Sequence, residues 1–339
     1  MEDIKTVLQA YSVQPFYIEK KTDHLYWVQD HQQQYALKQS HLTLELIPMW
    51  EKVYREAYEQ NLYAVLPVYL TRQGNIYQYY KGSIYYLTPW RGEAVTTFDK
   101  LTAERFFHNI GRVHAKTKQS HLIETEDFSA TFQQYRDHCK QLKQQLLGFV
   151  EQYEKNRYMS PLELLICTQY RDIDFCLQES IRRIDQLIYE QETEKDWNYS
   201  LCHGNIYASH ILKNKEQLYL INWEKARFDY PVYDLADFFK HETNHYDTPT
   251  DTFLQAFESY MNENKLSKKE LYLLIIQLLD AQPYLNQLEM HARSKKTMIE
   301  QIVELQYEFR RILFGLHFSA YVENKYDTLD LDDLDDEED

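Results

Sequence analysis

The stretch from residue 200 to residue 236 gathers side chains whose types could do chemistry. His203 and His210 offer imidazoles, Glu224 offers a carboxylate, and Asn205 and Asn222 offer amides. Two histidines and an offset glutamate could in principle hold zinc or manganese, but isolated histidines are more often hydrogen-bonded core residues. We therefore expect no metal centre in this stretch.

A hairpin has to position these side chains. After the turn at His203 and Gly204, the pattern predicts two short strands, 211–212 and 218–221, around the polar turn 213–216. Helical periodicity dominates on both sides of this hairpin. A hairpin set among helices is where we expect a functional site, because connecting segments on a rigid scaffold often carry function.

The first quarter of the chain predicts an antiparallel sheet interrupted by one helix. Residues 44–61 repeat apolar side chains such as Trp50, Val53 and Ala57 at helical spacing. Around them lie short aromatic or β-branched segments separated by polar turns, the pattern of strands. The predicted strands are 16–18, 25–28, 34–38, 66–70, 76–80 and 84–87.

Helices take over after residues 89–92. Long periodic stretches cover 98–118 and 128–155, and capping boxes at 160–163 and 267–270 open further helices. The chain is thus predicted to be α+β with a domain boundary near residue 90. The predicted parts are a sheet lobe at 1–90, a helical lobe at 91–326 and an acidic tail at 327–339.

Composition excludes several functional classes. With 37 Lys and Arg against 53 Asp and Glu among 339 residues, the net charge of -16 repels nucleic-acid phosphates. No apolar run is long enough to span a membrane, and the first residues lack the form of an export signal, so we expect the protein to stay inside the cell. The four cysteines form no close pair, which favours reduced thiols: Cys139, Cys167, Cys176 and Cys202.

Two further biases carry expectations of their own. The 30 tyrosines either pack as amphipathic side chains or expose phenols that serve adhesion. With only 7 glycines, few sites can be built from glycine-rich loops. The tail 327–339 holds nine acidic residues. It is either a disordered solubilising end or a docking handle for a basic partner.

The motif order resembles that of aminoglycoside and choline kinases, a branch of the protein-kinase fold. Residues 201–212 contain His-Gly-Asn where that family has His-Gly-Asp, and 221–224 read Ile-Asn-Trp-Glu where it has Ile-Asp-Trp-Glu. The Asp-Leu-Ala motif follows at 234–236. Lys38 matches the lysine strand of kinases, and 87–92 matches the hinge. The resemblance runs over about residues 10–320 and implies a two-lobed kinase-like fold with a small antiparallel-sheet lobe and a larger helical lobe.

Within that family the chain most resembles the spore-coat branch of endospore-forming bacteria, of the CotS and YutH type. Length, tyrosine richness, low glycine content and the Asn-for-Asp pattern carry this resemblance. It implies synthesis in the mother-cell cytoplasm, a place in the spore coat and other coat proteins as partners.

The departures from the family motif affect the phosphoryl-transfer chemistry. Asn205 stands at the catalytic carboxylate, and its amide cannot take a proton near neutral pH. Asn222 and His210 stand at the positions that hold magnesium, which prefers hard anionic oxygens. The turn 20–24 contains no glycine to close on phosphates, and its Asp23 would repel them.

The resemblance leaves roles open for the residues that remain. Lys38 is either a vestigial nucleotide contact together with Glu56, or a structural ion-pair partner of Glu51 or Glu56. His203 is expected to hold the fold by bonding backbone or the strand of Asn222. Asp234 is expected to accept backbone N–H bonds from the catalytic loop.

These readings together predict a pseudokinase that acts as a structural or interaction protein of the spore coat. We expect no cofactor, with ATP and magnesium bound weakly at most. The alternatives are a small-molecule phosphotransferase in which Glu224 or another metal replaces the lost groups, and a nucleotide-binding module without turnover. The partner surface is expected in the tyrosine-rich first lobe, with half of its tyrosines exposed: Tyr77, Tyr79, Tyr80, Tyr85 and Tyr86.

Overall fold

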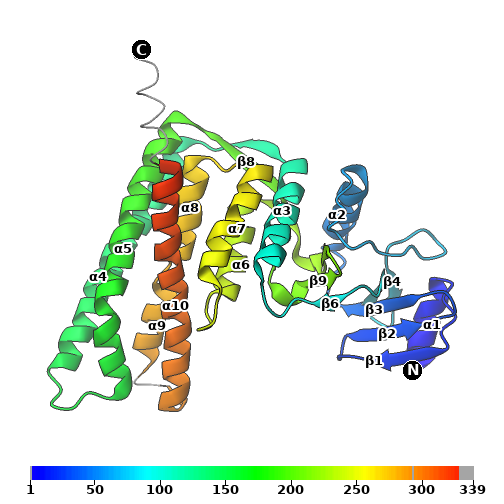
Figure 1. Cartoon of the computed structure of the whole chain (residues 1–339), viewed down its shortest axis with the longest axis horizontal. Coiled ribbons are helices and arrows are strands. Elements are labelled where there is room, and N and C mark those ends of the chain that lie inside the picture. The colour runs from blue at the N-terminus through cyan, green and yellow to red at the C-terminus, as the bar shows by residue number, and fades with distance from the viewer. Residues whose placement is uncertain (1, 292–293, 328–339) are drawn as a thin grey trace. The chain divides into compact units, whose positions relative to one another are not determined.

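The structure, a computed structural model, describes residues 2–291 and 294–327 (Figure 1). The chain divides into two compact units, and each unit is built from two separate stretches of sequence. The first unit comprises Met1–Lys118 and Ser200–Asp229, and the second comprises Gln119–Tyr199 and Tyr230–Asp339. The predicted boundary near residue 90 falls inside the first unit, and the division into lobes stays a prediction.

A five-stranded antiparallel sheet forms the start of the first unit, with strand order β1-β2-β3-β5-β4. The helix α1, Glu2–Ala10, was not anticipated from the sequence; its Ile4, Val7 and Leu8 join the core formed by one face of this sheet. The strands are β1 Tyr17–Lys20, β2 Leu25–Gln29, β3 Gln34–Ser40, β4 Gln78–Tyr80 and β5 Ser83–Pro89.

The predicted helix at 44–61 is confirmed as α2, Ile47–Glu59. Its buried stripe includes Trp50, whose ring centroid lies 5.0 Å from that of Tyr86 on β5. Neighbouring residues of a strand point to opposite faces, so Tyr85 joins the core that α1 completes while Tyr86 faces Trp50. Both tyrosines are buried whereas Tyr79 is half exposed, so only part of the tyrosine set is available for the partner surface expected there.

The predicted strand at 66–70 is wrong. This segment runs without strand pairing apart from an isolated bridge between Val65 and Leu220 just before it. The backbone N–H of Leu66 donates to Leu220 O, and that of Tyr69 donates to Leu87 O. Pro67 has no N–H to contribute to a ladder, which explains why aromatic and β-branched residues do not make a strand here.

The predicted hairpin is confirmed as β9, Ile211–Asn214, and β10, Gln217–Leu220, which pair antiparallel. The short strand β6, Glu93–Ala94, adds to β9. Gly92 precedes it with φ +60, and a Cβ there would lie 2.3 Å from Lys213 O, so only glycine permits this close approach. The remaining elements of the first unit are α3 Lys100–Lys116, the 3₁₀ turns Ala208–His210 and Trp223–Lys225, and β11 Arg227–Asp229, which pairs with residues 200–202 of β8 Asp196–Cys202.

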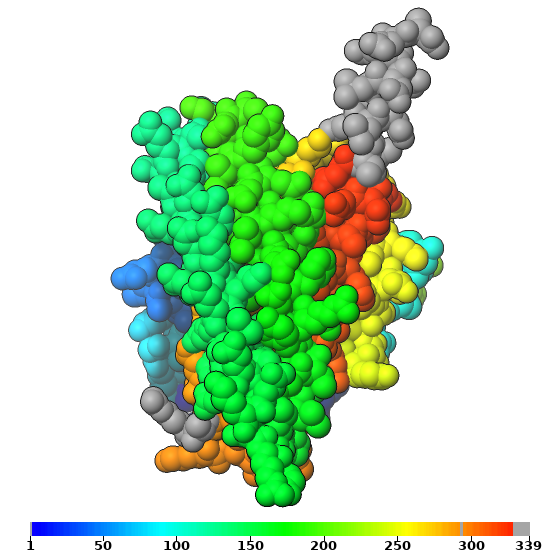
Figure 2. All heavy atoms as spheres, turned by 90° about the vertical axis from the view of Figure 1, so that its left-hand side faces the viewer, coloured from blue at the N-terminus to red at the C-terminus, as the bar shows by residue number. Residues whose placement is uncertain are grey.

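Helices dominate the second unit, where α4 and α5 form a long hairpin (Figures 1 and 2). The capping boxes at Ser160 and Ser267 are confirmed, since each serine and the glutamate three residues later bond reciprocally. Both views place α10 beside α5, where buried Arg183 donates to Ser319. The elements are β7 Gln119–Leu122, α4 Thr125–Glu154, α5 Pro161–Thr193, α6 Pro231–Glu242, α7 Thr250–Glu263, α8 Lys268–Leu278, α9 Gln282–His291, α10 Met298–Val322 and a π-helical turn Glu323–Asp327.

Three further expectations concern the whole chain. None of the four cysteines forms a disulfide within the described residues, in line with the prediction of reduced thiols. Within residues 2–291 and 294–327, no helix combines the length and apolar character that a membrane crossing requires. The acidic tail lies outside the described residues from 328 onward, and its predicted disorder stays a prediction.

Candidate functional site

The candidate site joins strand β3 to the loop that follows β10. Lys38 Nζ lies 2.6 Å from Asn222 Oδ1 and 2.8 Å from Glu224 Oε1. The side chains of the ion pair are only 22% and 15% exposed. The structure therefore brings together three of the residues singled out from the sequence, and it pairs the lysine with the loop itself.

Tyr86 completes this cluster from the neighbouring strand. It lies directly opposite Lys38 in the register of β3 and β5, and its hydroxyl donates to Glu224 Oε1 at 2.9 Å. Burial, and then the Glu224 carboxylate, raise the pKa of Tyr86 well above its ordinary value. The phenol therefore stays protonated, and Glu224 accepts from both Lys38 and Tyr86.

The backbone at Asn222 directs the loop toward Lys38. Asn222 has φ 66 and ψ 44, a left-handed conformation that asparagine tolerates better than most residues. The 3₁₀ turn that follows buries Trp223, whose indole N–H donates to Leu220 O at 3.1 Å. Asn222 and Glu224, on either side of this buried ring, thus both reach Lys38.

His203 holds the other side of this loop. It is fully buried, and its Nε2 lies 2.7 Å from Ile221 O, which is the kind of backbone contact expected of it. Gly204 has φ +74, and a Cβ there would lie 2.3 Å from Lys225 O. The stretches around 203–205 and 221–225 therefore run in backbone contact that a side chain at position 204 would disrupt.

His210 also serves the loop. Its Nδ1 lies 2.8 Å from Asn205 O, so Nδ1–H donates to that carbonyl. Burial lowers the pKa of His210 from 6.5 to about 4, and its ring centroid lies 3.9 Å from that of Tyr207, with the two rings tilted by 35°. The imidazole is therefore neutral near pH 7 and holds the backbone carbonyl of Asn205.

The remaining expected contacts have mixed outcomes. The ion pair expected between Lys38 and Glu51 or Glu56 is wrong, since among the described residues the carboxylate beside Lys38 is Glu224. The loop supplies this partner because Asn222 turns its backbone there. Asp234 is buried in the first turn of α6 in the second unit, and its bonds to the catalytic loop stay a prediction.

The turn between β1 and β2, where the sequence resemblance predicts a phosphate loop, pairs its own charged side chains with one another. Lys20 Nζ lies 2.9 Å from Asp23 Oδ1, and Lys21 Nζ lies 2.6 Å from Glu19 Oε1. The bond from Lys20 lowers the pKa of Asp23, so this carboxylate is ionised near pH 7. A phosphate approaching the turn would meet paired lysines, an anion and no glycine.

The donor set does not fit the magnesium that the family implies. Asn222 Oδ1 is neutral and accepts from Lys38, and Glu224 accepts from Lys38 and Tyr86. The third family position holds the imidazole of His210, a poor ligand for magnesium. A divalent cation at Asn222 would also face the Lys38 ammonium 2.6 Å from the ligand oxygen.

Sequence reasoning did not anticipate the role of Tyr86 in this cluster. The pattern that could have found it is the pairing of β3 with β5, because a residue opposite Lys38 in register shares its face of the sheet. The register depends on turns between distant strands, so the sequence alone left it open.

Comparison with known proteins shows which family and which solved structures this chain is similar to. Residues 18–271 match the phosphotransferase enzyme family, APH. A crystal structure of an aminoglycoside phosphotransferase from Alicyclobacillus acidocaldarius is 18% identical with a TM-score of 0.71, covering 94% of this chain and 96% of that one. The AMP-bound spectinomycin phosphotransferase APH(9)-Ia is 13% identical with a TM-score of 0.56, covering 92% and 96%.

An amicoumacin kinase, hAmiN, in complex with AMP-PNP is 14% identical with a TM-score of 0.54 and covers 93% of this chain and 94% of that one. A search of curated proteins found no match. The structures share the fold, with an antiparallel sheet in the N-terminal region and a helical C-terminal part, and the family match spans three quarters of the sequence. The chain belongs to the phosphotransferase enzyme family and has its kinase-like fold.

Proposed function

We propose that this protein is a kinase-like protein that does not transfer phosphate and that acts as a structural or interaction component of the bacterial spore coat. The two halves of the proposal have different support. The site geometry supports the loss of phosphoryl transfer, and the sequence resemblance supports the coat.

The contact of Lys38 with Asn222 and Glu224 carries the first half. In the family's chemistry this lysine contacts phosphates, while a carboxylate at position 222 holds magnesium. Here the lysine binds the loop at 2.6 and 2.8 Å, and the amide that replaces the carboxylate accepts from it. A nucleotide would have to break a partly buried ion pair and would gain no metal anchor from Asn222.

The spore-coat assignment rests on the length, the tyrosine content and the Asn-for-Asp substitutions at 205 and 222. It proposes synthesis in the mother-cell cytoplasm and contacts with other coat proteins. A fluorescent fusion in sporulating cells should gather at the coat. Uniform cytoplasmic fluorescence throughout sporulation would contradict this half alone.

Thermal unfolding with and without ATP and magnesium tests the first half. A millimolar ligand that binds with micromolar affinity would stabilise the folded state by about 4 kcal/mol, and we expect no such shift. Transfer of radiolabelled γ-phosphate by the purified chain to water or to an acceptor would overturn the proposal. That outcome would favour the alternative in which Glu224 serves an atypical metal site.

The matched variant restores both carboxylates, Asn205→Asp with Asn222→Asp. Both substitutions keep side-chain size, and aspartate also tolerates the left-handed backbone at 222. We expect this variant to gain magnesium binding, seen as a metal-dependent rise in Tm. If the wild type already shows the same rise, the altered residues are not what weakens the site.

A further inference from the structure

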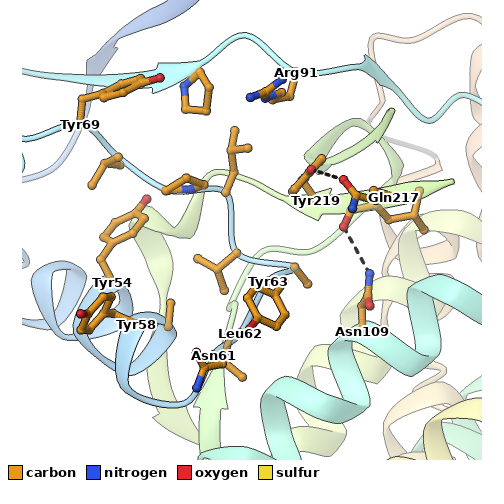
Figure 3. A pocket seen from close by; sticks show the side chains of 18 of the residues that line it. Tyr54, Tyr58, Asn61, Leu62, Tyr63, Tyr69, Arg91, Asn109, Gln217 and Tyr219 are labelled. Carbon is orange, nitrogen blue, oxygen red and sulfur yellow. Dashed lines mark hydrogen bonds between the residues drawn. The ribbon is translucent and has the colours of Figure 1, made fainter. Parts of the chain in front are cut away.

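A large pocket lies in the first unit away from Lys38. It has a volume of about 1210 Å³ and is lined by α2, the extended segment after it, the end of the hinge, α3 and β10 (Figure 3). Lys38, Asn222 and Glu224 are not among its lining residues. It is therefore a separate cavity, and nothing in the site described above explains it.

The walls of this pocket are mostly aromatic and aliphatic. Three of its large apolar side chains remain far more exposed than a folded chain normally leaves them: Tyr58 at 86%, Tyr63 at 75% and Leu70 at 59%. Contiguous exposed apolar surface of this kind is typical of a binding site. The other large apolar lining residues are Tyr54, Leu62, Leu66, Tyr69, Ile76, Leu218 and Tyr219.

The pocket also carries arginines in a strongly acidic protein. Arg105 pairs with Glu216 at 3.2 Å. Arg55 and Arg91 also line the pocket, and neither has a carboxylate within ion-pair distance among the described residues. Arg91 lies across the pocket from Tyr63 and Leu62 in Figure 3. An anionic group bound there would meet guanidinium groups that bond carboxylates well.

We propose that this pocket docks a segment of a partner protein that presents aromatic or aliphatic side chains next to carboxylates. The apolar side chains would cover the exposed rings and Leu70, and the carboxylates would pair with Arg55 and Arg91. This proposal stands whether or not the Lys38 site transfers phosphate.

The size and form of the pocket favour a polypeptide over a small ligand. Its volume exceeds the range of about 300 to 1,000 Å³ that holds most small molecules. Tyr58 and Tyr63 line the pocket with most of their surface in water, and a compact ligand would leave much of that surface uncovered. A segment laid across the wall would bury both rings.

The test is a selection that makes no assumption about the sequence of the partner. A phage-displayed library of random dodecapeptides is selected on the immobilised full chain. We expect enriched peptides that combine Phe, Tyr, Leu or Ile with Asp or Glu. Fluorescence anisotropy of one labelled synthetic peptide then gives its Kd for the wild type, Arg91→Glu and Tyr63→Ser, each expected to bind about tenfold more weakly or worse.

A matched pair elsewhere on the surface provides the control. Arg157 and Tyr158 are exposed and lie in the second unit, so Arg157→Glu and Tyr158→Ser make the same chemical changes outside the pocket. Both should bind the peptide like the wild type, and all four variants should keep its Tm. The proposal fails if no peptide is enriched, if enriched peptides lack carboxylates, or if the pocket variants retain full affinity.

Discussion

Lys38 is held by two oxygen atoms that come from a single short loop. An exposed ion pair contributes little, because water screens it and both side chains must be ordered. The pair of Lys38 with Glu224 is mostly shielded, and the amide of Asn222 and the phenol of Tyr86 extend it into a small network. Removing Lys38 takes the donor from the Asn222 amide and the cation from Glu224, which then keeps only the hydrogen bond from Tyr86.

Replacing the lysine measures the stability that this network provides. Lys38→Met should lower the free energy of unfolding by about 1 to 3 kcal/mol, because Glu224 then stays partly buried without its cation. Urea unfolding measures this change. Lys20→Met, which removes a lysine from an exposed pair, should leave the transition close to that of the wild type. Equal effects would mean that the network adds no stability beyond that of an ordinary surface pair.

His210 gives the fold a defined pH dependence. Its pKa is about 4 in the folded protein and 6.5 in the unfolded chain, so between these values only the unfolded chain binds the proton. The contribution of the neutral His210 to the free energy of unfolding is fully present above pH 6.5 and is lost as the pH falls toward 4. Between about pH 7.5 and about pH 5 this group should remove about 2 kcal/mol from the free energy of unfolding.

The variant His210→Asn should lack this component, as determined from urea unfolding at both pH values. His317→Asn, which changes an exposed histidine on α10, should keep the slope of the wild type. If His210→Asn also retains it, His210 is not the group that titrates.

At the scale of elements, close backbone approach fixes the loop. Gly204→Ala combines a positive φ with a Cβ 2.3 Å from Lys225 O, and should lower the free energy of unfolding by at least about 2 kcal/mol. Gly74→Ala has a similar φ of +82 but nothing within 4 Å, so it should show backbone strain alone, about 1 kcal/mol. Chemical denaturation of both variants separates crowding from strain, and equal losses would remove the crowding argument.

Local sequence patterns predicted the helices that are determined by apolar spacing or by capping residues. The helical spacing around Trp50 gave α2, and the boxes at Ser160 and Ser267 gave the starts of α5 and α8. The segment at 66–70 failed because Pro67 overrides strand propensity, a local fact that the apolar pattern concealed. Helix α1 went unnoticed because its nine residues bury only three apolar side chains.

Most members of the candidate site were predictable from the sequence, but Tyr86 and the contacts between the members were not. The motif placed His203, Asn205 and His210 before the hairpin and Asn222 after it, and in the structure His203 Nε2 lies 2.7 Å from Ile221 O and His210 Nδ1 lies 2.8 Å from Asn205 O. The choice of Glu224 as the partner of Lys38 depends on long-range register and on the backbone at 222, which no short pattern encodes.

At the scale of the whole molecule, each unit is built from two separate stretches of the chain. The hairpin of β9 and β10 supplies the strand that pairs with β6 and the carbonyl that accepts from Leu66. The fragment 1–118 would lack this hairpin and both partners of Lys38. It should therefore show no cooperative thermal unfolding in near-UV circular dichroism.

A single chain that joins the two stretches of the first unit tests whether the complete unit folds on its own. Thr117 Oγ1 accepts from Leu201 N–H at 3.0 Å, so the two stretches meet and a Gly/Ser linker of about five residues can connect 118 to 200. This chain should unfold cooperatively. If the fragment 1–118 unfolds just as cooperatively, the second stretch is not needed for the fold.

The left-handed backbone at Asn222 bears on how this protein could change with time. Asparagine and aspartate are the two residues that accept such a backbone with a short branched polar side chain, and their codons differ at one base. A lineage could thus exchange the amide for an acid in one genetic step without rebuilding the turn. Loss of the anion at this position would be readily reversible, unless Lys38 and Glu224 had become essential to folding.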